Sequence, residues 1–261
     1  MPPSARLVRT RLTSGTVAAL SVLLVAGCSS SHAHTASSTV AGTTPNSATT
    51  TPTTTPTTSS TSSGSATVAA ALQRLVLRTG DLPAGWTGAA YQSSPGASNA
   101  HAAFSQCAGI PNSDSAKTGE VHSDDFSQGE ATISSEAFGY SSAAAVTSDR
   151  SAIAGPKAKQ CFQTLFDQQL RAALPAGSTL KPPSVTVTPG AVAGMSNVVG
   201  TVSASVSVSA SGQSITVYVG AVFIAGPTIE AEVTYENVGA PFDTGVLDTA
   251  VRAVSQRVAG A

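Results

Sequence analysis

Two histidines, His101 and His122, are the residues outside the N-terminal region whose chemistry best suits proton transfer. A serine or cysteine nucleophile needs such a base, and the base needs an orienting acid within hydrogen-bond reach. Asp124 and Asp125 follow His122 closely, but no Gly-x-Ser-x-Gly motif is present. We therefore interpret both histidines as solvated loop residues and predict no catalytic residue. The alternative is a hydrolase with an unrecognised site.

A second pair, Ser178 and Lys181, has the Ser-x-x-Lys spacing of a serine nucleophile and its general base. Such a pair works when both residues lie on one helical turn, because the lysine then faces the serine. Pro182 and Pro183 follow at once and stop a helix from continuing. The spacing therefore indicates no catalytic site.

Candidate metal ligands are few and poorly spaced. His32 and His34 form a His-x-His pair without further ligands nearby. His122 with Asp124 and Asp125 would give a weak surface site. A zinc site needs three or four converging nitrogen, sulfur or carboxylate ligands. We predict no metal site, and no motif indicates another cofactor.

Apolar side chains recur at every second position of three neighbouring segments, residues 202–209, 215–223 and 229–235, with many polar side chains between them. This period of two predicts three strands, each with one apolar and one polar face. Short turns would join them into an antiparallel meander. Its polar face would present hydroxyls and carboxylates to a glycan or a polar headgroup, or would simply be solvated. The binding candidates on this face are Ser205, Tyr218, Glu230 and Glu232.

The single tryptophan, Trp86, ends the turn formed by residues 81–85, and Tyr91 follows it. An amphipathic ring near a turn is suited to ligand contact, so Trp86 is a further binding candidate. A tryptophan at such a position also serves as a core anchor, and both interpretations stay open.

The elements that would position these residues are predicted from apolar periodicity. Helices are expected over residues 67–78, 142–152 and 157–174, with a last helix from about Asp243. A strand is expected over residues 130–140. The fold class predicted is α+β: one domain in which an antiparallel sheet, including the C-terminal meander, is packed on one face by helices.

Residues 1–27 have the pattern of a secretory leader. Arginines precede an apolar run at residues 16–26. As a helix this run would be roughly 16 Å long, too short for a hydrocarbon core of about 30 Å. Small residues then stand directly before Cys28, as in a bacterial lipobox. We expect cleavage before Cys28, acylation of its thiol with palmitate-type chains, and anchoring at the extracytoplasmic face of the cell membrane. An ordinary signal peptide with an incidental cysteine is the alternative.

A stalk is predicted at residues 28–66, which are almost wholly Ser, Thr, Ala, Pro and Gly without a charged or aromatic side chain. Such a segment cannot bury enough apolar surface to offset its chain entropy. Its Thr/Pro run is a candidate for O-glycosylation. The folded extracytoplasmic domain is then expected at residues 67–261.

The low charge of the chain limits which partners it can bind. Charged residues make up 10% of the chain, and the formal net charge is -1. Nucleic-acid binding relies on a basic excess that neutralises phosphates, so no nucleic-acid partner is predicted. The expected partners are the membrane, through the lipid anchor, and a cell-wall glycan, a lipid or an envelope protein.

Two cysteines, Cys107 and Cys161, remain once Cys28 is lipidated. Two thiols in an exported domain are expected to form a disulfide bond. The bond would join the segment around Cys107 to the long helix at residues 157–174. Two free buried cysteines are the alternative.

Several features together resemble actinobacterial, largely mycobacterial, envelope lipoproteins of unassigned role. These features are the lipobox, the stalk, the segments LVLRTGDLPAGW and NVGAPFD, and the amphipathic C-terminal helix. The layout also resembles the PknH-like extracellular sensor domains of receptor serine/threonine kinases and LpqN-type lipoproteins with a Mog1/PsbP-like fold. The resemblance implies a twisted antiparallel sheet backed by helices, often with a cleft. The kinase sensors have two disulfides, whereas one can form here, and the resemblance supplies no catalytic residue.

The sequence therefore favours a non-enzymatic lipoprotein of the cell envelope with a sensor-like domain that binds a ligand or partner. The alternatives are an envelope hydrolase and an accessory protein of envelope assembly or transport. A cleft in which histidines and carboxylates converge would favour the enzyme.

Overall fold

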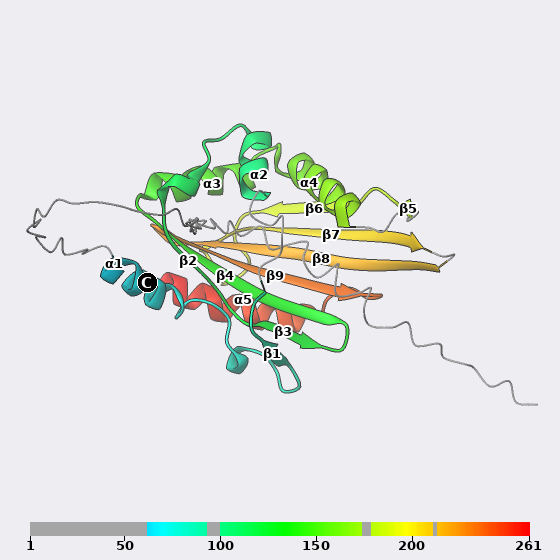
Figure 1. Cartoon of the computed structure of the whole chain (residues 1–261), viewed down its shortest axis with the longest axis horizontal. Helices are drawn as coiled ribbons and strands as arrows, with labels where there is room; N and C mark the ends of the chain where they lie inside the picture. The colour runs from blue at the N-terminus through cyan, green and yellow to red at the C-terminus, as the bar shows by residue number, and fades with distance from the viewer. Residues whose placement is uncertain (1–61, 93–99, 174–178, 211–212) are drawn as a thin grey trace, which may run out of the picture.

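The computed structural model describes residues 62–92, 100–173, 179–210 and 213–261 (Figure 1). The predicted leader, Cys28, most of the predicted stalk and the turn at residues 211–212 lie outside the described residues. No helix in the described part combines the length and the apolar character that a bilayer-spanning segment requires.

In the described part of the chain, a nine-stranded antiparallel sheet forms the centre, with strand order β1-β3-β4-β9-β8-β7-β5. β2 pairs with β4, and β6 pairs with β7. The strands are β1 (Thr87–Ala89), β2 (Lys117–His122), β3 (Asp125–Gln128), β4 (Ala131–Tyr140), β5 (Thr179–Leu180), β6 (Ser184–Pro189), β7 (Val198–Ala210), β8 (Gln213–Ala225) and β9 (Ile229–Val238).

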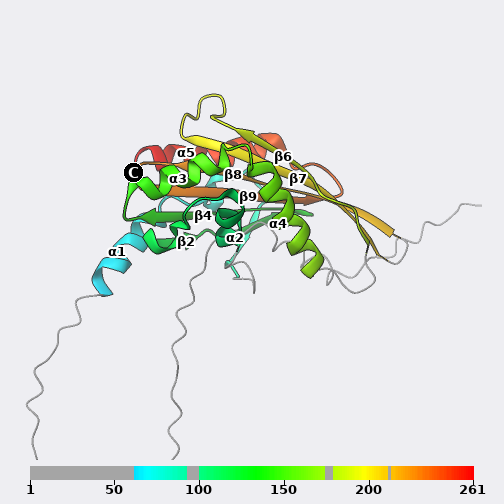
Figure 2. The ribbon, with the colours of Figure 1, turned by 90° about the horizontal axis from the view of Figure 1, so that it is seen from above.

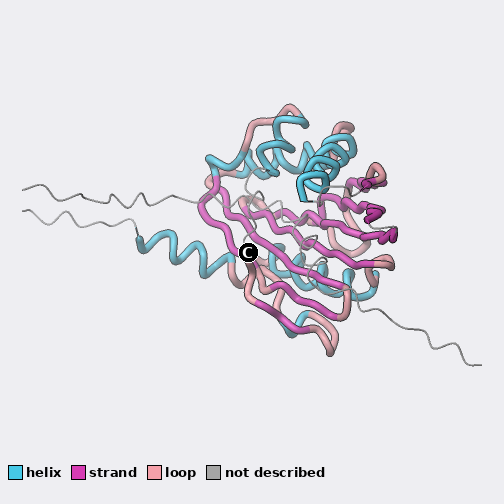
Figure 3. The backbone as a smooth tube through the Cα atoms, turned by 45° about the vertical axis from the view of Figure 1, so that its right-hand side comes forward, coloured by secondary structure: helices cyan, strands magenta, loops and turns pink. Residues whose placement is uncertain are grey.

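Helices cover both faces of this sheet (Figures 1 and 3). On one face lie α1 (Ser62–Leu72) and α5 (Thr244–Ala259), whose apolar residues share one core cluster with β4, β8 and β9. On the other face lie α2 (Ala100–Ala108), α3 (Ala143–Ile153) and α4 (Ala158–Ala173), as the view from above shows (Figure 2). The α+β class and the antiparallel sheet are confirmed, but the helical layer lies on two faces instead of one.

The predicted elements match the observed ones in the C-terminal half. The meander is formed by β7, β8 and β9, with alternating side chains as its period of two requires. The last helix begins after Asp243, whose carboxylate accepts hydrogen bonds from the amides of Gly245 (2.7 Å) and Val246 (3.1 Å). The helix predicted over residues 67–78 differs most. The observed helix, α1, ends at Leu72, and irregular turns follow.

The strand register corrects one expectation about the meander. We assumed that the apolar residues of all three strands share a face. β8 places Ala221 opposite Thr234 and Phe223 opposite Glu232. The apolar row of β9 therefore faces α5, while its polar row lies on the side of α4. A register offset of one residue moves a whole row of side chains to the other face.

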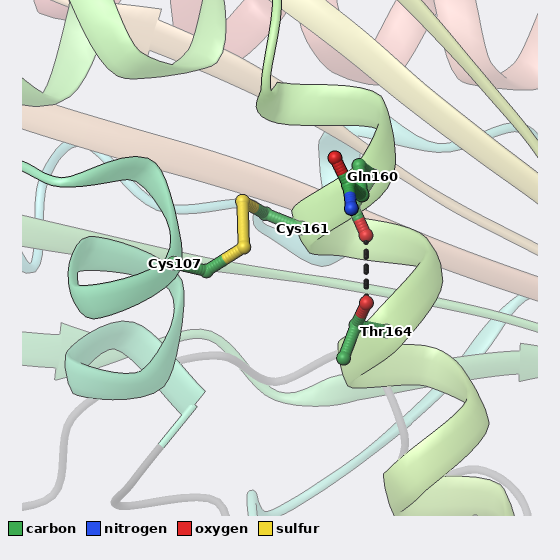
Figure 4. The surroundings of a disulfide bond; sticks show 4 residues. All are labelled: Cys107, Gln160, Cys161 and Thr164. Carbon is green, nitrogen blue, oxygen red and sulfur yellow. Dashed lines mark hydrogen bonds between the residues drawn. A yellow bond between two sulfur atoms is a disulfide. The ribbon is translucent and has the colours of Figure 1, made fainter.

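Cys107 of α2 and Cys161 of α4 form the predicted disulfide bond (Figure 4). Their Cα atoms lie 5.7 Å apart, within the ordinary range for a bridged pair. In α4, beside Cys161, the Thr164 hydroxyl donates a hydrogen bond to the Gln160 carbonyl at 3.0 Å. The bond joins two of the three helices that cover this face of the sheet.

Candidate functional site

A cavity of about 90 Å³ lies between the sheet and the helical layer of α2, α3 and α4. This space can hold several water molecules or a small organic molecule. Much of its lining is aromatic and aliphatic, from α2, α4 and the middle strands. The aromatic lining residues are Phe104, Phe138, Tyr140, Phe162, Phe166 and Phe223.

The apolar end of the cavity is built by contacts between rings on three elements. Phe162 of α4 lies 4.6 Å from Phe104 of α2 and 5.8 Å from Phe223 of β8, measured between ring centroids. These residues meet because the α4 stripe faces the sheet and the disulfide bond holds α2 beside α4. The end would accept an apolar group of a ligand.

The opposite end is polar and is formed mainly by β9 and β4. Glu230 accepts a hydrogen bond from the Tyr140 hydroxyl at 2.8 Å. Burial, followed by the charge of Asp149, raises the pKa of Glu230 to about 7. Burial and the neighbouring Glu230 also raise the pKa of Tyr140. At neutral pH this end therefore holds a carboxyl group near its midpoint of ionisation.

Glu232 is a second carboxyl group that lines the cavity. Its side chain is 6% exposed. Within the described part of the chain it has no hydrogen bond or ion pair, although it faces the cavity. It lies opposite Glu136 across β4 and β9. Burial raises the pKa of Glu232 to about 8, against the opposing effect of the His101 charge. A buried polar group without a partner is costly, so a ligand group that pairs with it would gain free energy.

His101 enters the cavity wall from α2 and lies between two aspartates. Its Nδ1 is 3.1 Å from Asp114 Oδ1, and its Nε2 is 3.6 Å from Asp149 Oδ2. Lys117 of β2 lies 3.3 Å from Asp114 and 3.6 Å from Glu120, so it links this group to the neighbouring acids. The prediction that His101 is a solvated loop residue is wrong, because it lies on a helix and lines the cavity.

Ser113 and His101 come close to the geometry of a hydrolase. The Ser113 hydroxyl lies 3.4 Å from His101 Nε2, while His101 Nδ1 faces Asp114. However, the hydroxyl donates to Asp149 Oδ2 at 2.6 Å. Ser113 is also absent from the residues that line the cavity. The Ser113 hydroxyl therefore donates its hydrogen bond to Asp149 instead of His101, and it does not face the cavity where a substrate would bind.

His122 is placed on β2, with its ring nitrogens against Glu120 and Glu136. The sequence pointed to Asp124 and Asp125 as its neighbours instead. Since side chains two residues apart on a strand share a face, Glu120 was the partner that the strand period could have indicated. Glu136 comes 14 positions after His122 in the chain, and the pairing of β2 with β4 brings it next to the His122 ring.

The five predicted binding residues are divided among three places. Glu230 and Glu232 line the cavity. Ser205 and Tyr218 lie opposite each other on β7 and β8, on the other face of the sheet. Trp86 is 7% exposed and packs against Phe242 at 6.0 Å between ring centroids, so it is a core anchor. The expectation of one shared polar platform is therefore wrong.

Sequence reasoning singled out His101 but placed it in a loop, and it missed Asp149 of α3 and Lys117 of β2. The three residues come from three elements whose proximity depends on the tertiary fold. A partial signal existed, because Phe162 and Phe166 lie on the amphipathic stripe of the long helix. That stripe predicts a buried face, but it does not distinguish a filled core from a cavity.

Comparisons with known proteins give little further information. No protein-family model matches the chain, and no curated protein matches its sequence. Among solved structures, it is similar to the crystal structure of the extracellular domain of PknH from Mycobacterium tuberculosis, with a TM-score of 0.39 and 10% sequence identity. The match covers 72% of this chain and 95% of that chain. At this TM-score the likeness supports no conclusion about function.

Proposed function

We propose that this chain is a non-enzymatic, lipid-anchored protein of the cell envelope whose folded domain binds a small amphiphilic ligand in the cavity. The observation that carries the proposal is the position of Glu232, a buried residue whose carboxyl group has no hydrogen bond or ion pair among the described residues and lies in the wall of a largely apolar cavity. A pocket of this kind binds the apolar body of a ligand, and its few polar groups fix the orientation.

The polar end favours a ligand group that donates hydrogen bonds or has a positive charge. Its acids include Asp149, Glu230 and Glu232. The bases His101 and Lys117 already lie against Asp114, Asp149 and Glu120. A protonated amine pairs with the ionised form of Glu232, whereas a carboxylate is repelled by each of the three acids that is ionised. We therefore infer an amine-bearing amphiphile as the ligand class.

Three probes of equal chain length test this assignment: octylamine, octanol and octanoate. Isothermal titration at pH 7 is expected to give the tightest binding for octylamine, then octanol, and the weakest for octanoate. A charge-assisted hydrogen bond contributes about 1.5–3 kcal/mol, so octylamine should lose roughly tenfold or more in affinity in Glu232→Gln. Its affinity should also rise from pH 6 to pH 9, because Glu232 must lose a proton.

The matched control is Glu130→Gln, which alters an exposed glutamate in the turn before β4. It should leave the order and the affinities of the three probes unchanged. Equal affinities for octylamine and octanoate in the wild-type protein would contradict the inferred ligand class. Equal octylamine affinity in Glu232→Gln would contradict the role of Glu232.

The location outside the cytoplasm is part of the same proposal. It is supported by the lipobox-like segment before Cys28 and by the disulfide bond of Cys107 and Cys161, since such bonds persist in oxidising compartments. A cell-wall lipid or glycan, or another envelope protein, is then the expected natural source of the ligand or partner.

A second candidate function is hydrolysis, and the order Ser113, His101, Asp114 is the observation that favours it. The test is the cleavage of p-nitrophenyl esters of short and long acids by the purified protein. If an activity is present in the wild type and lost in both Ser113→Ala and His101→Ala, the hydrolase replaces the binding protein as the preferred function. The commitment of the Ser113 proton to Asp149 predicts no such activity.

A further inference from the structure

A second group of titratable side chains lies beside the cavity, on the adjoining strands β2 and β4. Glu120 and His122 are two residues apart on β2 and share a face. His122 is paired across the sheet with Glu136 of β4. None of the three is among the residues that line the cavity, although Glu136 lies opposite Glu232, which does.

The donor atoms of these three residues converge. His122 Nε2 is 3.0 Å from Glu120 Oε1, and His122 Nδ1 is 3.4 Å from Glu136 Oε2. One donor atom from each residue can be chosen so that all lie within 4.8 Å of one another. The donors of a tetrahedral zinc site are separated by about 3.4 Å, given metal–ligand distances of roughly 2.0–2.2 Å. An ion would bind one ring nitrogen of His122, and the carboxylate that now faces the other nitrogen would have to turn toward the ion.

Glu136 provides the independent indication that a ligand belongs here. The residue is 2% exposed, and neither of its carboxyl oxygens has a hydrogen bond among the described residues. A buried carboxyl group in this condition either keeps its proton or takes up a cation that replaces the proton.

The imidazole of His122 is held in place from outside the group. The Tyr91 ring stacks on it, with 3.9 Å between the centroids and 4° between the planes. A fixed ring orientation lowers the cost of ordering a metal ligand, as outer partners do in known metal sites.

We propose that Glu120, His122 and Glu136 bind a divalent transition-metal ion, with one imidazole nitrogen and two carboxylates as ligands. This donor set suits Zn²⁺ and Co²⁺, whereas Ca²⁺ and Mg²⁺ prefer sites made wholly of oxygen. Binding gives the carboxyl oxygens of Glu136, which have no hydrogen bond among the described residues, a partner. The expected metal therefore stabilises the pairing of β2 with β4.

The test uses the full chain in a His32→Ala/His34→Ala background, because that His-x-His pair could bind metal by itself. After treatment with a chelator, the protein is titrated with ZnCl₂ by calorimetry and with CoCl₂ by visible absorption. We expect one ion per chain and a Co²⁺ spectrum with nitrogen and oxygen ligation. His122→Ala and Glu136→Gln should each weaken Zn²⁺ binding at least tenfold, and circular dichroism checks that both variants fold.

Asp124→Asn is the matched control, because it removes an exposed carboxylate two residues from His122 and outside the group. Its Zn²⁺ affinity should equal that of the background protein. The absence of Zn²⁺ binding in the background protein would overturn the proposal. So would equal affinity in folded Glu136→Gln, or a loss in Asp124→Asn as large as that in Glu136→Gln.

Discussion

Buried glutamates on one face of β9 are the most unusual residues of the molecule. Glu230, Glu232 and Glu236 alternate along the strand, and burial raises the pKa of each, to about 7, 8 and 7 respectively. Proteins seldom bury such groups without partners. Their retention on the cavity side is the residue-level reason to assign a ligand to this face.

These glutamates predict an inverted pH dependence of stability. In the unfolded chain a glutamate loses its proton near pH 4.3. In the folded chain Glu232 retains its proton to about pH 8. Between these values the folded state binds more protons, so the free energy of unfolding falls as pH rises, by about 1.4 kcal/mol per pH unit for each extra proton. Urea unfolding should therefore show higher stability at pH 5 than at pH 8.

The variant Glu232→Gln isolates this contribution, because glutamine does not titrate. Its stability should depend less on pH between pH 5 and pH 8 than that of the wild type, while Glu130→Gln should follow the wild type. A wild-type protein that becomes more stable over this range, with no change of slope in Glu232→Gln, would show that Glu232 is not held in its protonated form.

At the scale of elements, the helical layer above the cavity depends on the Cys107–Cys161 bond. α2 is short and contacts α4 along one side. The bond closes a loop with a sequence separation of 54 residues, for which the chain-entropy model gives about 4 kcal/mol of stability. Cys107→Ser/Cys161→Ser should lose stability of this order in urea unfolding, and octylamine affinity should fall with it.

Reduction provides the control for this element. Dithiothreitol should lower the stability of the wild-type protein to the level of the double variant and leave the double variant unchanged. If the double variant binds octylamine as tightly as the wild type, the position of α2 does not matter for the cavity.

The elements also show how far the sequence can be interpreted. The alternation along residues 202–209 predicted β7, and the spacing of Leu247, Val251, Val254 and Val258 predicted α5. The sequence did not reveal which side of β9 faces which helix. β8 is apolar on both faces around residues 219–225, as in a strand covered on both sides, so its pattern does not select a face. The register that decides this is set by the tertiary packing on both faces.

The cavity was less predictable than the fold for a related reason. Glu230 and Glu232 were identified as binding candidates from their strand, but His101 and Asp149 lie on helices whose packing no local pattern gives. Cavities also arise where packing is incomplete, and periodicity reports which residues are buried without reporting how well they fill space.

At the scale of the whole molecule, the proposed anchor predicts a defined mature N-terminus. Intact-mass analysis of the protein from its native membrane should find a chain that begins at Cys28 and has the added mass of diacylglycerol. Cys28→Ala should abolish the modification and the membrane association. An unmodified mature chain, or a chain with its leader intact in the cytosol, would contradict the anchored location.

The central claim is that the cavity between the sheet and the α2–α4 layer binds an amine-bearing amphiphile through Glu232. The most direct test is a crystal structure of the protein grown with saturating octylamine. The account predicts the amine within hydrogen-bond distance of the Glu232 carboxylate and the alkyl chain packed against the rings of Phe162 and Phe223 that line the cavity. An empty cavity in that crystal, or octylamine bound elsewhere on the molecule, would contradict it.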